Sequence, residues 1–259
     1  MAAHATEINH YMTSEIDSYK PTRVKVGWGL DLEHSSVVFQ SPKSLLKYRE
    51  KSLSNRAIQA CPAVNELERD FFVIECPFDI RLRCSNDENS YNLHMVEMGT
   101  RLDEDLIKEY LVLMDPKTWR KKDTPVIQLK IPYFFIADEP CYLSQLPPFM
   151  SKNSFSWPGT LVSGRFPTDL WPRVLNWAFE WTNLENDLIL KRGEHLCYLN
   201  FETSHAISKI DLVPIEKTPE LIKYRNDISA TPKFVSNTFS LFQTALERRP
   251  KKLLKELVK

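Results

Sequence analysis

The stretch that decides the fold class is Ser154–Phe201, SFSWPGTLVSGRFPTDLWPRVLNWAFEWTNLENDLILKRGEHLCYLNF. Tryptophans, tight-turn glycines and alternating apolar positions surround one isolated acidic residue, Glu180. Alternation with a period of two is typical of strands, and Lys191–Glu194 supplies a turn between two of them. The segment Trp177–Thr182 is aromatic enough to be buried, so its carboxylate requires either a partner or a function. We therefore predict that this stretch forms strands of a β-barrel wall, and we take Glu180 as the first candidate functional residue.

The same strand pattern continues on both sides of this stretch. Apolar runs at Arg23–Trp28, Phe71–Glu75 and Val126–Ala137 predict strands. With 17 prolines against 6 glycines, these strands are expected to be joined by stiff, well-defined turns. The expected fold class is therefore mainly β (α+β), an antiparallel β-barrel or sandwich with peripheral and C-terminal helices. Further strands are predicted at Ser36–Gln40, Asp79–Cys84, Tyr91–Glu97, Tyr142–Leu143 and Ile207–Ile215.

The chain is expected to divide into three parts. Residues 1–22 form a poorly anchored N-terminal segment, residues 23–216 a β-rich domain, and residues 217–259 a C-terminal helical segment. One peripheral helix is predicted from Ser41 to Leu53. A second is predicted to begin at a cap at Thr100, and Tyr110–Met114 fits either the end of this helix or a strand.

Helical signals are strongest near the C-terminus. Thr218 is expected to cap a helix that carries Pro219 in its first turn. Beyond Pro250 the apolar residues recur at helical spacing, and a short helix is stable only when its apolar stripe is covered. We therefore expect that stripe to pack on this chain or on a second copy. The stripe consists of Leu253, Leu254, Leu257 and Val258. Before Pro250, a separate helical face is predicted from Phe239, Phe242 and Leu246.

Composition excludes several classes of function. The 34 basic and 34 acidic residues cancel, so the chain lacks the positive excess by which proteins hold nucleic acid. No run approaches the ~18 apolar residues that span a bilayer, and residues 1–7 have neither a basic nor an apolar leader region. We expect a cytoplasmic protein without membrane contact and without nucleic acid as a partner.

Metal and cofactor motifs are also missing. The sequence has no phosphate loop, no glycine-rich dinucleotide fingerprint, no Gly-x-Ser-x-Gly elbow and no His-Glu-x-x-His. No histidine has an acidic residue two positions on, as iron oxygenases usually require. The five cysteines lack a Cys-x-x-Cys pair and are expected to be free thiols, the alternative being a metal held by Cys141, His195 and Cys197. We expect no metal site and no cofactor.

The order of residues around Glu180 resembles the core of dCTP deaminases and dUTPases, which have a β-clip fold. In that family a glutamate on the corresponding strand is the general base, and a serine- and arginine-containing run holds the nucleotide phosphates. The resemblance implies that Glu180 is catalytic and that Mg²⁺ accompanies a bound deoxynucleotide, although Trp157 stands at the phosphate-binding arginine position. It rests on Ser154, Gly159, Arg165, Asp169-x-Trp171, Phe179–Asn183, Leu188–Gly193 and Leu199-x-Phe201. The implied substrate-binding residues are Lys152, Ser154, Arg165 and Asn183.

A second resemblance is to uncharacterised proteins encoded by tailed phages of marine bacteria. It implies a phage origin and assigns no activity. The cues are Ala60–Val64, Cys76–Asp79, Leu146–Met150 and Lys191–Leu199.

Two functions follow as hypotheses. The first is a non-enzymatic β-barrel protein, phage-encoded and located in the host cytoplasm, that acts through binding or assembly with a protein partner or a second copy. The second is a deoxynucleotide-binding enzyme of the β-clip type. Glu180 would be a structural carboxylate in the first case, paired with an arginine such as Arg165 or Arg192, and a base in the second. The tryptophans are expected to be core residues, and Pro147–Phe149 a rigid turn.

Overall fold

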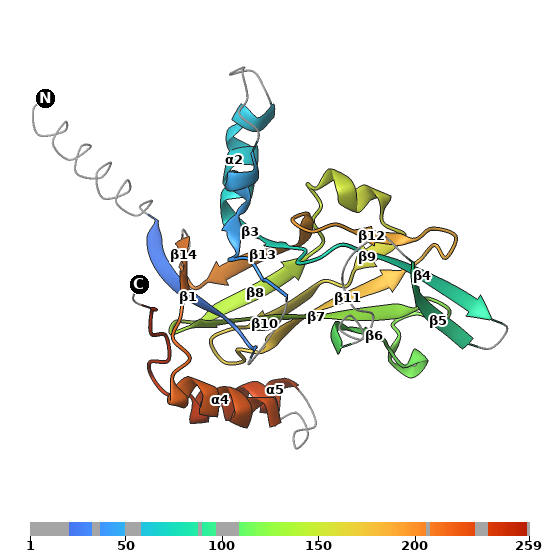
Figure 1. The fold of residues 1–259 in the computed structure, drawn as a ribbon. Coiled ribbons are helices and arrows are strands. Elements are labelled where there is room, and N and C mark those ends of the chain that lie inside the picture. Colours follow the sequence, from blue (N-terminus) through green and yellow to red (C-terminus); the bar gives the residue numbers. More distant parts are fainter. Residues whose placement is uncertain are drawn as a thin grey trace, which may run out of the picture.

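The computed structural model describes residues 21–32, 37–49, 58–87, 90–96, 109–205, 208–230 and 238–257. In these ranges the chain is mainly β, with curled sheets that form a half-barrel, as predicted (Figure 1). All strand pairs are antiparallel except one, the parallel pair of β1 with β14. No helix of the described residues is long and apolar enough to cross a membrane.

The first sheet is built on one long central strand, β7 (Val126–Ala137), whose bounds are those predicted. Its odd-numbered residues, such as Tyr133 and Phe135, face the main core, and Phe134 and Ile136 face a second core on the other side. A strand that is buried on both faces has a continuous apolar sequence, and this is why β7 could be predicted. The other strands of this sheet are β1 (Thr22–Leu30), β6 (Leu111–Leu113), β9 (Gly159–Leu161), β11 (Val174–Trp181) and β14 (Ser208–Pro214).

The second sheet follows directly from the first, because the chain turns sharply at residues 138–140 between β7 and β8. Thr168 holds this corner: its hydroxyl donates to the Phe135 carbonyl (2.7 Å) and its N–H donates to the Cys141 carbonyl (2.8 Å). The sheet contains β2 (Lys43–Ser44), β3 (Phe71–Glu75), β8 (Cys141–Leu146), β10 (Gly164–Pro167) and β13 (His195–Thr203).

The third sheet is a hairpin with one short added strand. It consists of β4 (Ile80–Asp87), β5 (Ser90–Met95) and β12 (Leu188–Leu190). The turn at Lys191–Glu194, with Gly193 at φ +82°, carries the chain from this sheet into β13 of the second sheet. The predicted turn therefore exists, but the two strands that it connects do not pair with each other.

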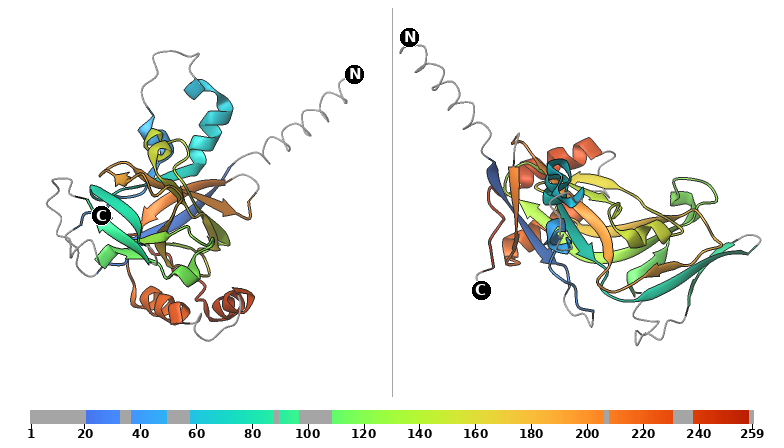
Figure 2. Two further views of the ribbon diagram at one scale, coloured as in Figure 1. Left: turned by 90° about the vertical axis from the view of Figure 1, so that its right-hand side faces the viewer. Right: turned by 90° about the horizontal axis from the view of Figure 1, so that it is seen from above.

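Helix α2 lies on one side of the half-barrel, and α4 and α5 lie on the opposite side (Figures 1 and 2). Thr218 caps α4 as predicted, because its hydroxyl accepts the Leu221 N–H (3.2 Å). Leu221 and Tyr224 of α4, with Ala245 of α5, pack in the second core. The helices are α2 (Pro62–Asp70), α4 (Pro219–Ala230) and α5 (Thr238–Arg248), and the 3₁₀ turns are η1 (Leu45–Tyr48), η2 (Ile58–Ala60), η3 (Pro116–Thr118) and η4 (Lys152–Ser156).

The predicted C-terminal helix is wrong, because residues 250–257 form an extended tail. Glu256 makes a β-bridge with Ile215, and the Leu257 N–H donates to the Pro214 carbonyl (2.9 Å). These bonds to a distant segment replace the helical bonds that a run of this length makes poorly in water. Leu253 is buried and Leu257 is exposed, so packing on this chain is confirmed for the first part of the stripe. Val258 lies outside the described residues.

Other expectations had mixed outcomes. Residues 37–40 are not a strand; instead Val37 is buried in the core and the Gln40 carbonyl accepts the Tyr133 hydroxyl (2.5 Å). The predicted helix from Ser41 is reduced to η1, with residues 50–57 outside the described ranges, and α2 had not been predicted. Tyr110–Met114 contains β6, so the strand alternative is correct there. Of the helix predicted from Thr100, residues 100–108 lie outside the described residues, and Glu109 and Tyr110 are helical. Most of the N-terminal segment also lies outside the described residues.

Candidate functional site

Glu180 lies on β11, between β7 and β9. Side chains alternate along a strand, so Trp177, Phe179 and Trp181 face the core and Glu180 faces outward. Gly159 of β9 makes this packing possible, because a Cβ atom there would lie 1.9 Å from the Glu180 carbonyl oxygen. The tryptophans at 177 and 181 are core residues, as predicted.

Arg120 covers the Glu180 carboxylate. The Arg120 Nε and Nη2 atoms donate to the two carboxylate oxygens at 2.8 and 2.6 Å. The Glu180 side chain is 2% exposed and the Arg120 side chain 64% exposed, so the guanidinium closes the carboxylate off from solvent. The hydrogen bonds from Arg120 lower the pKa of Glu180, with a further contribution from Lys121. A carboxylate held in this way is a weak base.

The predicted arginine partners of Glu180 are therefore wrong. Arg165 pairs with Glu202 of the second sheet (2.9 Å) and lies 3.8 Å from the ring centre of Tyr142. The Arg192 backbone N–H donates to Asp79 (2.9 Å). Sequence distance hid the true partner, since Arg120 is 60 positions from Glu180 and reaches it from the segment between η3 and β7.

Three of the four predicted substrate-binding residues, Ser154, Arg165 and Asn183, have local partners. The Ser154 hydroxyl donates to the carbonyls of Pro148 and Ser151 (both 2.9 Å), and the Asn183 side chain accepts the Glu185 N–H (3.0 Å). Lys152 is exposed on η4, and Arg165 belongs to a different sheet from Glu180. Within the described ranges, no hydrogen bond or ion pair joins any of these four residues to Glu180.

A polar cluster on the outer face of the second sheet had not been predicted. His195 Nδ1 lies 2.9 Å from the Tyr198 hydroxyl, and its ring packs edge-on against Tyr48 at 4.5 Å. Tyr48 and Lys43 both donate to Glu75, at 2.5 and 2.8 Å. No pattern in the sequence indicates this cluster, because residues three apart on a regular strand face opposite sides. A register shift in β13 between His195 and Cys197 places His195 beside Tyr198.

Burial and hydrogen bonding together set the protonation of this cluster. It lowers the pKa of His195, and the nearby Glu75 carboxylate opposes that effect only in part. Burial acts to raise the pKa of Glu75, but the hydrogen bonds from Lys43 and Tyr48 outweigh it and bring that pKa below its usual value. At neutral pH the arrangement is thus a neutral imidazole beside an ionised carboxylate, whose Oε1 atom accepts from both Lys43 and Tyr48.

An aromatic loop, residues 147–155, borders this cluster. Phe155 is 77% exposed, and Phe149 and Met150 are each 40% exposed. The Phe149 ring packs edge-on against Phe71 (5.3 Å) and Tyr198 (5.2 Å). The loop is a tight turn, as predicted, since the Ser151 N–H donates to the Pro148 carbonyl (2.8 Å). It presents apolar side chains to solvent from a fixed base.

A cleft of about 710 Å³ lies between β1, the start of α4 and the C-terminal tail. Its basic residues are largely neutralised: Lys25 pairs with Glu256 (2.5 Å) and Lys255 with Glu216 (2.7 Å). Acidic residues balance the rest of the lining. The cleft therefore offers no positive excess for nucleotide phosphates.

No group of three or more His, Cys, Asp or Glu side chains in the described part of the chain is arranged to hold a metal ion. All five cysteines are free, as predicted. The Cys197 thiol accepts the Gln145 side-chain amide (3.7 Å), and His195 faces Tyr198 rather than Cys141 or Cys197.

Comparisons with protein-family models, curated proteins and solved structures found no match to this chain.

Proposed function

We propose that this chain is a phage-encoded β-rich protein that acts by binding or assembly, with a protein as its partner, and that it performs no chemistry of its own. The observation that carries the proposal is the aromatic loop. Aromatic and methionine side chains are enriched at the centres of protein interfaces, where a few anchors supply most of the binding energy. Phe149, Met150 and Phe155 offer such anchors on a loop that is already ordered.

The surroundings of Glu180 support the same proposal. A general base must present a free oxygen to its substrate, and a pKa close to the working pH is most effective. Both Glu180 oxygens accept from Arg120, and the pKa of the carboxyl group is lowered. The carboxylate therefore fits a structural role at the edge of the core.

The alternative is a deoxynucleotide-binding enzyme of the β-clip type. It keeps the resemblance around Glu180 and would need Arg120 to move when substrate enters. In this alternative Lys152, Ser154, Arg165 and Asn183 bind the nucleotide, with Mg²⁺ on its phosphates. The separate local contacts of Ser154, Arg165 and Asn183 make this the second choice.

One paired experiment tests the choice. The tagged chain and its Phe155→Ser variant are used to recover bound proteins from a lysate of the source cells, with Leu246→Ser as the matched control. Leu246 is 66% exposed on α5 and lies outside the aromatic loop. We expect a partner that the wild type and the control retain and that Phe155→Ser loses.

The same samples are heated with millimolar dCTP or dUTP and Mg²⁺. A ligand at about 100 times its dissociation constant adds about 2.7 kcal/mol to stability, which a melting curve detects. We expect no shift. A raised melting temperature, or identical bound proteins for all three samples, would contradict the binding proposal.

A further inference from the structure

The hairpin of β4 and β5 projects from the body of the protein (Figures 1 and 2). Strand β12 pairs with β4 only at Ile80–Leu82, so the remaining part of the hairpin has two strands. A two-stranded ribbon is marginally stable in water, and three or more strands with a covered apolar face are needed for independent stability. The ribbon is thus an element that gains from an added strand.

Among the strands that the structure describes, none pairs with the outer edge of β5. The Val96 N–H donates to the Arg81 carbonyl (2.9 Å), so even-numbered residues direct their backbone groups toward β4. The pairing of β4 with β5 is regular, so the odd-numbered residues direct their backbone N–H and C=O groups away from β4. These residues are Tyr91, Leu93 and Met95.

This edge also lacks the usual protection against association. Exposed edges are normally short, charged or interrupted by proline. Strand β5 is six residues long and contains neither charge nor proline. The edge strand β14 is of similar length but carries Lys209 and Asp211, and the edges at β2, β9, β10 and β12 have four residues or fewer.

We propose that β5 pairs with β5 of a second copy of this chain, antiparallel and about a two-fold axis at Leu93. In this register Leu93 faces the partner's Leu93, Tyr91 faces the partner's Met95, and Asn92 faces the partner's His94. In this symmetric register, all three residues whose backbone groups point away from β4 are paired with the second copy. Each of their N–H groups therefore meets a carbonyl of the partner strand. A shift of the axis to either neighbouring residue leaves one of the three unpaired.

Side chains agree with this register. Tyr91, Leu93 and Met95 share the face that packs partly against the main core, where the Trp119 ring lies 5.0 Å from Tyr91. Joining two copies extends that apolar face and brings an aromatic ring to a methionine, which is a favourable contact. The absence of charge on β5 means that no like charges oppose each other. The proposal extends the assembly function by naming a second copy as a partner, and it does not use the aromatic loop.

The test is the mass of the protein in solution, measured by sedimentation equilibrium. We expect the wild type to form a dimer of the 30.3 kDa chain. Leu93→Lys and Leu93→Glu should each be monomeric, since like charges would face each other across the axis. Such a juxtaposition costs several kcal/mol, which corresponds to weakening by about 100-fold or more.

A one-to-one mixture of the Leu93→Lys and Leu93→Glu variants should restore the dimer, because residue 93 then faces an opposite charge. Ile189→Lys, at an exposed position of β12 in the same sheet, is the matched control and should remain dimeric. Melting curves verify that each variant is folded. A monomeric wild type, an unchanged dimer for both charged variants, or a mixture that stays monomeric would overturn the proposal.

The Phe155→Ser variant separates this result from the proposed partner binding. It should keep the dimer and lose the partner, as both proposals expect. A monomeric wild type that still binds the partner through Phe155 would overturn only the pairing of β5. A dimeric wild type whose bound proteins are unchanged in Phe155→Ser would overturn only the partner binding.

Discussion

Arg249 and Arg120 each bind a carboxylate, but the two ion pairs differ in which member is buried. In the first pair the Arg249 side chain is 9% exposed and Asp138 27% exposed. In the second the Glu180 side chain is 2% exposed and Arg120 64% exposed. A buried carboxylate that loses its partner can take up a proton, whereas arginine stays charged and must find acceptors. The two pairs are therefore expected to respond differently to mutation and to pH.

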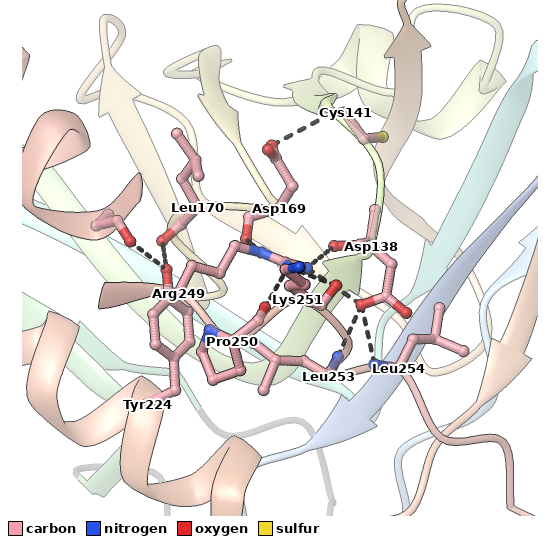
Figure 3. A network of polar contacts seen from close by, with 12 residues as sticks. Asp138, Cys141, Asp169, Leu170, Tyr224, Arg249, Pro250, Lys251, Leu253 and Leu254 are labelled. Carbon is pink, nitrogen blue, oxygen red and sulfur yellow. Dashed lines mark hydrogen bonds and ion pairs between the residues drawn. The ribbon is translucent and has the colours of Figure 1, made fainter. Parts of the chain in front are cut away.

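Arg249 obtains those acceptors from the backbone (Figure 3). Its guanidinium donates to the carbonyls of Asp169 (2.8 Å), Ala137 (2.6 Å) and Pro250 (2.6 Å). Asp138 in turn accepts the N–H groups of Leu253 (2.8 Å) and Leu254. One side chain thus joins α5, the corner between the two large sheets and the C-terminal tail.

The largest effect is expected for Arg249→Met. It leaves the carbonyls of Asp169 and Ala137 without their donor, and each buried polar group without a partner costs about 1–3 kcal/mol. We expect a loss of about 3 kcal/mol in the free energy of unfolding, measured by urea denaturation, and faster proteolysis of the tail. The control is Arg248→Met, the exposed neighbour that ends α5. Equal losses for the two variants would contradict the contrast.

A smaller effect, of a few degrees in melting temperature, is expected for Arg120→Ala. The pair holds the pKa of Glu180 below its ordinary value of 4.5. Its contribution to stability is therefore complete above about pH 4.5 and is lost as the pH falls through the lowered pKa. The difference between wild type and Arg120→Ala should shrink in acid, as measured by melting curves at neutral pH and below pH 4.

Arg120→Lys is the matched control, because it keeps the charge and loses the two-nitrogen fork. We expect it to lie between wild type and Arg120→Ala. A loss for Arg120→Ala that is the same at both pH values would show that the guanidinium acts through packing and not through the carboxylate.

Local signals in the sequence predicted the fold well. The continuous apolar run of β7 and the cap at Thr218 depend on neighbouring residues alone, and both were found. The spacing of Leu253 and Leu257 fits a helix, and the pairing of the tail with Pro214–Glu216 that replaces it joins segments about 40 positions apart. Such pairing is decided by tertiary contacts, which a periodicity does not contain.

Less of the candidate site could be predicted, because its contacts also join segments that are distant in the sequence. The aromatic sequence around Glu180 predicted a buried carboxylate with an arginine partner, and both features are present. The identity of that arginine depends on how a loop folds over β11. The cluster at His195 depends on a bulge, which has no clear signature in this sequence.

The smallest effect on stability is expected for His195. Glu180 and Arg249 each form an ion pair with an oppositely charged side chain, whereas His195 does not form such a pair within the described part of the chain. Tyr198 and Tyr48 contact its ring, Glu75 is the nearest acid, and Lys43 already pairs with that acid. Burial lowers the pKa of His195 from 6.5, so the unfolded chain binds the proton more readily than the folded chain. Stability is therefore complete above about pH 6.5 and falls as the pH drops below it, with a slope of at most about 1.4 kcal/mol per pH unit for one proton.

His195→Gln removes the titrating group and keeps a polar side chain at this position. We expect the variant to flatten the decline in stability between pH 6.5 and 5, measured by urea denaturation at several pH values. His205→Gln is the control, because His205 is a more exposed histidine that pairs with Glu139 (3.0 Å) on the surface. A slope that survives in His195→Gln and disappears in His205→Gln would assign the pH dependence to the surface pair and would leave the His195 cluster without a measurable electrostatic role.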